Sequence, residues 1–142
     1  MLTQLLIGSL LICLTIVVEA ICLGTALIGI QRLRPWLRSG PGIPKLIASI
    51  ALITLWMLGG LSVSVWSWAG AMMLLELFVT LEEAVYFSIV SFTTLGFGDD
   101  ILPQPWRLLS GLIATNGLVL FGLTTAFLFE ALDRLRLAQE GN

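Results

Sequence analysis

One short segment of the chain carries residues whose types and spacing suit cation binding by the backbone. It reads Thr-Thr-Leu-Gly-Phe-Gly-Asp over residues 93–99, with Gly96 and Gly98 two positions apart. Because glycine adopts torsions that other residues avoid, glycines at alternate positions let successive carbonyl groups point to one side. A row of such carbonyls around an axis can replace the water shell of a bare cation. Each chain holds one such segment, so a closed ring of carbonyls requires several copies.

A short apolar helix is predicted directly before this segment, from residue 81 to about residue 92. Thr80 and Glu83 have the spacing of a capping box, in which each side chain accepts a hydrogen bond from the other residue's backbone. A helix of this length measures roughly 18 Å, which is too short to cross a bilayer. Residues 84–92 are nevertheless too apolar to lie in water. We therefore expect a re-entrant half-helix whose negative C-terminal end points toward the cation site.

Three further stretches are long and apolar enough to cross a membrane: residues 1–30, 46–75 and 108–129. Apolar residues make up 58% of the chain and charged residues 11%, whereas a soluble domain carries roughly 25% charged residues. The first stretch lacks basic residues ahead of its apolar part and an A-x-A-like cleavage site, so we expect a mature helix rather than a signal peptide. The predicted fold class is an all-α membrane protein with three transmembrane helices plus a re-entrant helix and loop.

The distribution of basic residues predicts the orientation of the chain. Residues 31–45 contain three prolines and two glycines, which should interrupt any helix there. The same stretch holds four basic residues: Arg32, Arg34, Arg38 and Lys45. By the positive-inside rule this loop lies on the cytoplasmic side of the cell membrane. Three crossings then place the N-terminus outside the cell and the C-terminus, with Arg134 and Arg136, in the cytoplasm.

The residue types that most enzymes and metal sites need are missing. The chain has no histidine, and therefore no Ser/His/Asp or Cys/His set. Cys13 and Cys22 would lie about 13 Å apart along one helix, too far for a disulfide. We therefore expect no enzymatic activity, no cofactor and no nucleic-acid partner, and we expect contact with membrane lipid.

Residues 93–99 resemble the T-T-V-G-Y-G-D filter signature of potassium channels. Leu95 replaces Val and Phe97 replaces Tyr, substitutions that occur within that superfamily. Residues 86–88, Tyr-Phe-Ser, are similar to the aromatic-aromatic-Ser of the channel pore helix, and residues 107–126 resemble a channel inner helix. The layout is similar to that of small bacterial members of the potassium-channel pore superfamily, including the two-pore type.

The resemblance implies a domain organisation and a function. Residues 46–132 would form the pore domain, with an outer helix, a pore helix, a filter and an inner helix. Residues 1–34 would add a peripheral transmembrane helix, residues 35–45 a basic cytoplasmic loop, and residues 133–142 a short cytoplasmic tail. A homotetramer with one central pore would conduct potassium passively, and potassium would be the permeant ion rather than a cofactor.

The resemblance also implies roles for individual residues. Backbone carbonyls and one threonine hydroxyl would bind potassium, and the last glycine would close the outer end of the filter: Thr94, Leu95, Gly96, Phe97 and Gly98. Four side chains would line an aqueous cavity below the filter: Thr93, Leu118, Phe121 and Thr125.

Two residues, Tyr86 and Asp99, would support the filter. Some channels pair the acid that follows the filter with a glutamate of the pore helix, but this chain has Val90 at that position. Asp99 therefore needs another partner. Trp106, Arg107 and the neighbouring pore helix are the alternatives.

Three residues within the predicted spans have two interpretations each. Gly117 stands at the position of a gating hinge, or it allows close helix packing. Glu19 is a costly intramembrane acid. It is either a pH-sensitive or partner-binding site, protonated or bonded to a hydroxyl such as that of Ser62 or Ser64, or a neutral acid satisfied at a helix interface. Asn116 is expected to bond across a helix interface rather than to line the cavity.

Two alternative functions stay open at this point. A weakly selective cation channel is possible because Leu95 and Phe97 alter the packing behind the filter. A non-conducting regulatory subunit of a membrane complex is the other. A transporter with four pore-like repeats is disfavoured, since 142 residues hold one repeat. The first span lacks the repeated arginines of a voltage sensor, so gating by pH, lipid or an unknown partner stays open.

Overall fold

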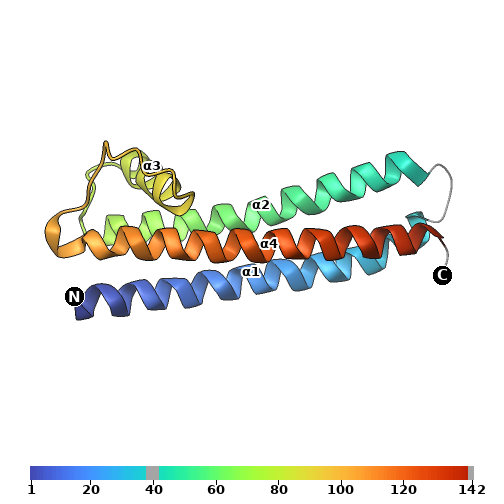
Figure 1. The fold of residues 1–142 in the computed structure, drawn as a ribbon, viewed down its shortest axis with the longest axis horizontal. Coiled ribbons are helices and arrows are strands. Elements are labelled where there is room, and N and C mark those ends of the chain that lie inside the picture. Colours follow the sequence, from blue (N-terminus) through green and yellow to red (C-terminus); the bar gives the residue numbers. More distant parts are fainter. Residues whose placement is uncertain (38–41, 141–142) are drawn as a thin grey trace.

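The computed structural model describes residues 1–37 and 42–140, which form a bundle of long helices (Figure 1). The described elements are four α-helices and one 3-10 turn: α1 (Leu2–Leu37), α2 (Gly42–Leu74), α3 (Leu81–Phe92), η1 (Gln104–Trp106) and α4 (Arg107–Glu140). Three of these helices, α1, α2 and α4, are long and apolar enough to span a membrane. The predicted all-α fold class with three spans is therefore confirmed.

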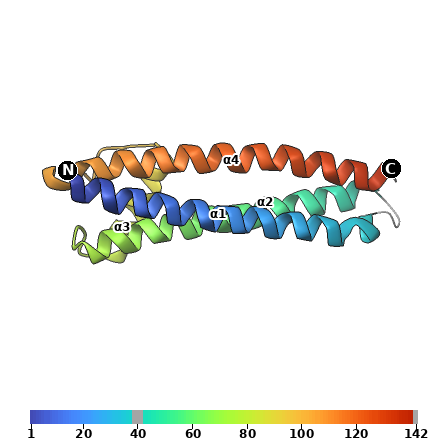
Figure 2. The same ribbon diagram turned by 90° about the horizontal axis from the view of Figure 1, so that it is seen from below.

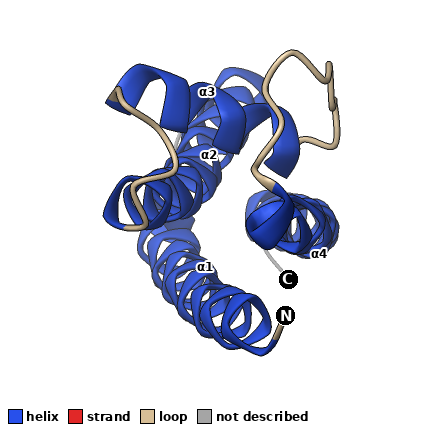
Figure 3. Cartoon of the chain, turned by 90° about the vertical axis from the view of Figure 1, so that its left-hand side faces the viewer, coloured by secondary structure: helices blue, strands red, loops and turns tan. Residues whose placement is uncertain are grey.

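The three long helices lie side by side, with α2 running opposite to α1 and α4 (Figures 1 and 2). The N-terminus lies at the same end of the bundle as α3, and the C-terminus lies at the other end (Figure 1). Viewed along the bundle, α1 contacts both α2 and α4, while α3 sits over α2 and α4 at one end (Figure 3). This arrangement puts the end of α3 and the segment after it next to the first half of α4.

Local hydrogen bonds explain where α2 ends and α3 begins. Glu76 adopts a left-handed φ of 55° and follows the last turn of α2. The Leu77 N–H donates to the Met72 carbonyl at 3.1 Å, the bond that closes a Schellman motif. The Glu83 N–H then donates to the Thr80 hydroxyl, and the Thr80 N–H donates to the Glu83 carboxylate. The predicted capping box is confirmed, and α3 has the bounds that it predicts.

The helices around the predicted loop are longer than the sequence indicates. α1 continues through Pro35 to Leu37, and α2 begins at Gly42 with Pro44 in its first turn. Prolines are tolerated at both places because N–H groups in the first turn lack helical partners, and because Pro35 removes one bond from a final turn. Residues 35–37 and 42–45 are helical, so the expectation of a loop over residues 35–45 is wrong for these residues. Arg38 lies outside the described residues.

α4 also continues beyond its predicted end. No glycine or proline follows Gly122 before Glu140. The Arg134 guanidinium pairs with the Glu130 carboxylate at 2.6 Å, an i,i+4 contact that supports the helix. Most of the expected cytoplasmic tail, residues 133–140, is therefore a helical extension of the inner helix.

Candidate cation-conducting site

The end of α3 packs directly against α4. The Phe92 side chain is buried, and its ring meets the Phe121 ring edge to face with centroids 5.6 Å apart. A Cβ built on Gly117 would lie 1.9 Å from the Phe92 carbonyl oxygen, well inside van der Waals contact. Glycine at 117 is therefore required for the close approach of the two helices. This is the packing interpretation of Gly117.

A Schellman motif ends α3 and turns the chain into the predicted filter. The Leu95 N–H donates to the Val90 carbonyl at 3.0 Å, and the Thr94 N–H donates to the Ser91 carbonyl at 3.0 Å. Thr94 takes the left-handed position of this motif with φ of 60°, where glycine is usual. A left-handed threonine costs roughly 1–3 kcal/mol. The hydrogen bonds at the end of α3 therefore impose the left-handed torsion on Thr94, which threonine does not favour by itself.

Left-handed torsions then recur at every second residue. Gly96 has φ of 57° and Gly98 has φ of 80°, whereas Leu95 and Phe97 have negative φ. Alternation between torsions of opposite sign turns successive peptide planes so that their carbonyls can share one side. A Cβ on Gly98 would meet nothing within 4 Å, so torsion rather than space requires glycine there. The expected conformation of the two glycines is confirmed.

The predicted filter and cavity residues are exposed in the single chain. Leu95 is 57% exposed and Phe97 is 66% exposed, large values for apolar side chains beside a packed helix. Thr93 and Phe121 line one hollow between α2, α3 and α4. Leu118 and Thr125, spaced three and four residues from Phe121 on α4, are exposed as well. The structure thus presents these residues on surfaces that the chain itself leaves uncovered.

Tyr86 is the partner of Asp99. The Tyr86 hydroxyl donates to the Asp99 carboxylate at 2.5 Å. This hydrogen bond holds the pKa of Asp99 below its usual value and raises the pKa of the Tyr86 phenol. Within the described residues, neither Trp106 nor Arg107 bonds Asp99, and the Arg107 guanidinium donates to the Leu102 carbonyl instead. The partner therefore comes from the chain's own pore helix.

Glu19 is fully buried where α1, α2 and α4 meet. The Thr124 hydroxyl donates to one carboxylate oxygen at 2.6 Å, and the other oxygen has no hydrogen-bond partner in the described chain. Ser62 and Ser64 donate to carbonyls of their own helix, so the expectation that either bonds Glu19 is wrong. A Cβ on Gly60 would lie 2.9 Å from the free carboxylate oxygen, so glycine there leaves room for the acid.

Two more polar contacts join α1 to α4. The Asn116 amide donates to the Thr15 hydroxyl at 2.8 Å, and both residues are buried, which confirms the interface expectation for Asn116. The Gln4 side chain accepts from the Leu108 N–H at 3.2 Å and donates to the Pro105 carbonyl, so it caps the start of α4. Sequence reasoning missed Gln4 and Thr15. Each is a polar residue within an apolar span, and this feature of the sequence could have indicated a contact with another helix.

The site can be compared with known proteins at this point. A family model described as an ion channel matches residues 50–134, more than half of the chain. The match includes most of α2, all of α3 and most of α4, and leaves α1 outside. No curated protein and no solved structure matches the chain significantly. Three membrane-length helices, the re-entrant α3 and this match show that the chain is a membrane protein of the ion-channel family with a potassium-channel-like pore.

Proposed function

We propose that four copies of the chain form a potassium-selective channel around residues 94–98. The observation that carries this proposal is the left-handed torsion at Thr94, Gly96 and Gly98 in a segment exposed beside the end of α3. The carbonyls of Thr94, Leu95, Gly96 and Phe97, with the Thr94 hydroxyl, would replace the water around a potassium ion. Conduction would be passive, with potassium as the permeant ion and no resident cofactor.

The exposed apolar side chains support assembly into a ring. Leu95 and Phe97 leave most of their surface uncovered although they follow a buried helix end. Large exposed apolar groups next to a functional segment are typical of an interface. In the proposed tetramer the pore helix of a neighbouring copy covers them, and the same contact holds the carbonyls at their spacing around the axis.

Two further features favour a cation at that axis. The C-terminal end of α3 carries partial negative charge and leads directly into the segment. Asp99, fixed by Tyr86, adds an acid at the outer end. In the orientation that the basic residues favour, this end of the bundle is external, the N-terminus is outside and the C-terminus is cytoplasmic.

The test is ion flux in liposomes that contain the purified protein, with the oligomeric state measured in the same preparation. We expect a tetramer that passes potassium faster than sodium. Gly96→Ala should stop the flux because alanine at φ of 57° costs about 1–2 kcal/mol and alters the carbonyl row. Gly59→Ala, where a Cβ meets nothing within 4 Å, is the matched control and should conduct normally.

Other outcomes separate the alternatives. Potassium passing no faster than sodium would identify a weakly selective cation channel, in which the packing of Leu95 and Phe97 leaves the filter loose. No flux from the wild type in a correctly assembled tetramer would favour a non-conducting regulatory subunit. Either outcome would refute the proposed selective channel.

A further inference from the structure

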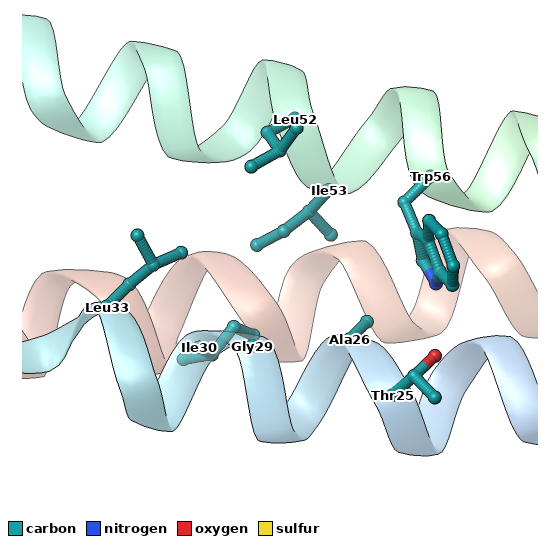
Figure 4. A pocket seen from close by; sticks show the side chains of 8 residues that line it. All are labelled: Thr25, Ala26, Gly29, Ile30, Leu33, Leu52, Ile53 and Trp56. Atoms are coloured by element: carbon teal, nitrogen blue, oxygen red, sulfur yellow. The ribbon is translucent and has the colours of Figure 1, made fainter.

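A groove on the side of the bundle lies away from the proposed filter (Figure 4). Its volume is about 280 Å³, and its walls are five residues of α1 and three of α2: Thr25, Ala26, Gly29, Ile30, Leu33, Leu52, Ile53 and Trp56. The small residues Ala26 and Gly29 make it deep, and a Cβ on Gly29 would meet nothing within 4 Å. The Leu52 and Trp56 side chains flank the opening between the two helices (Figure 4).

The residues that line the groove lie within the segments of α1 and α2 that are long and apolar enough to span a membrane. From Thr25 to Leu33 it follows α1 for about 12 Å, at ~1.5 Å per residue. The Trp56 indole N–H donates to the Cys22 carbonyl at 3.1 Å, which holds the ring across the two helices at one end. Trp56 is still 51% exposed. The result is an apolar groove with an aromatic side chain at one end.

The other end of the groove leads to basic residues. Arg32 is exposed and lies three residues beyond Gly29, on the same face of α1. Lys45 lies seven residues before Leu52, on the same face of α2. Its ammonium donates to the Trp36 carbonyl at 2.8 Å and lies 4.9 Å from the centre of the Trp36 ring. This contact holds the Lys45 charge where α1 ends and α2 begins.

We propose that the groove binds one acyl chain of an anionic phospholipid, with the lipid phosphate against Arg32 and Lys45. The apolar groove suits a hydrocarbon tail, and the basic residues at its end suit a negatively charged headgroup at the membrane surface. Basic pockets between membrane helices bind acidic lipids in this manner. The occupant is accordingly a lipid of net negative charge rather than phosphatidylcholine. This inference is independent of potassium conduction.

The experiment measures quenching of Trp56 fluorescence by lipids with brominated acyl chains. The protein is placed in phosphatidylcholine vesicles with a low fraction of either brominated phosphatidylglycerol or brominated phosphatidylcholine. The difference between wild type and Trp56→Phe isolates the Trp56 signal. We expect the anionic lipid to bind roughly thirtyfold more tightly than the neutral one, from two basic residues that each attract an acidic lipid.

Two pairs of variants test the two parts of the site. Arg32→Gln should reduce the preference for phosphatidylglycerol, whereas Arg136→Gln, an exposed base on α4, should not. Gly29→Leu should fill the groove and reduce quenching by the anionic lipid. Gly24→Leu, where a Cβ also meets open space outside the groove, should leave it unchanged.

Equal quenching of Trp56 in the wild-type protein by both lipids would overturn the proposal. Absence of Trp56 quenching by either lipid would also overturn it, because another copy of the chain would then cover the groove. Equal effects of Gly29→Leu and Gly24→Leu on quenching by the anionic lipid would mean that the lipid does not bind in the groove, and this would also overturn the proposal. None of these outcomes depends on ion flux, so they are separate from the test of the channel.

Discussion

The substitution Gly117→Ala tests whether this glycine serves packing or bending. A Cβ at this position would lie 1.9 Å from the Phe92 carbonyl oxygen and 2.8 Å from the Phe92 carbonyl carbon. These atoms belong to backbone at the end of α3, so no side-chain rotation can relieve the contact. Either α3 or α4 must move; α3 leads into residues 94–98, and α4 carries the residues proposed to line the cavity.

The expected loss of stability follows from how far α3 and α4 must separate. An ordinary contact needs about 3.4 Å, so the helices must separate by roughly 1.5 Å at this point. Overpacking of this kind costs typically about 1–3 kcal/mol. A hinge glycine in a helix predicts the opposite sign, because alanine stabilises a helix interior by about 1 kcal/mol relative to glycine. The sign of the change in stability therefore separates the two interpretations.

The assay is thermal unfolding of the purified protein in detergent, measured as the loss of the folded species on a sizing column after heating. Gly111→Ala and Gly122→Ala are matched controls on the same helix, since a Cβ at either position meets nothing within 4 Å in the chain. We expect Gly117→Ala to unfold at lower temperature than wild type and both controls to unfold at the same or higher temperature. A Gly117→Ala protein as stable as the controls would refute the packing argument.

Two further substitutions test contacts that the sequence did not predict. Gly60→Ala should destabilise the bundle by about 1–3 kcal/mol, because its Cβ would lie 2.8 Å from the Cys22 sulfur and 2.9 Å from the Glu19 carboxylate, and thermal unfolding against Gly59→Ala measures this. Tyr86→Phe should remove the bond to Asp99 and lower thermal stability at neutral pH. Because that bond lowers the pKa of Asp99, the wild-type advantage should be full above the usual pKa of about 3.9 and be lost as pH falls through the lowered value.

Clear results would contradict each expectation. Equal stability of Gly60→Ala and Gly59→Ala would mean that the space around Glu19 adapts without cost. A Tyr86→Phe protein whose deficit persists unchanged at the lowest pH would mean that the tyrosine acts through packing rather than through the Asp99 carboxylate. Far-UV circular dichroism of each variant would verify that the helices are retained.

The sequence predicted the pore elements because their signals are local. A capping box fixed the first residue of α3, and the glycines at alternate positions predicted the torsions that follow it. The left-handed torsion of Thr94 could not be read from its type, since it arises from the bonds that close the end of α3. The helix ends near Pro35 and Pro44 were wrong for a related reason. A proline in the first turn of a helix removes no helical hydrogen bond, and Pro35 in the last turn of α1 removes one, so neither proline stops its helix.

The partners of buried and charged side chains were less predictable, because each depends on which helix faces which. Glu19 bonds Thr124, more than a hundred residues away along the chain. Ser62 and Ser64 carry suitable hydroxyl groups, but each hydroxyl donates to a carbonyl of its own helix, as serines in apolar helices often do. No pattern in a single sequence specifies such pairings.

The polar contacts of α1 have a mechanical consequence for the inner helix. Asn116 is bonded to α1 on the buried side of α4, whereas Leu118 and Thr125 lie on nearly the opposite, exposed side. A movement of α4 that leaves α1 in place would break the contacts of Asn116 and Thr124. Polar contacts between membrane helices contribute about 0.6 kcal/mol on average and up to about 1.7. α1 and α4 should therefore move together. Although α1 lies outside the residues that the family model matches, it would still act on the surface proposed to line the cavity.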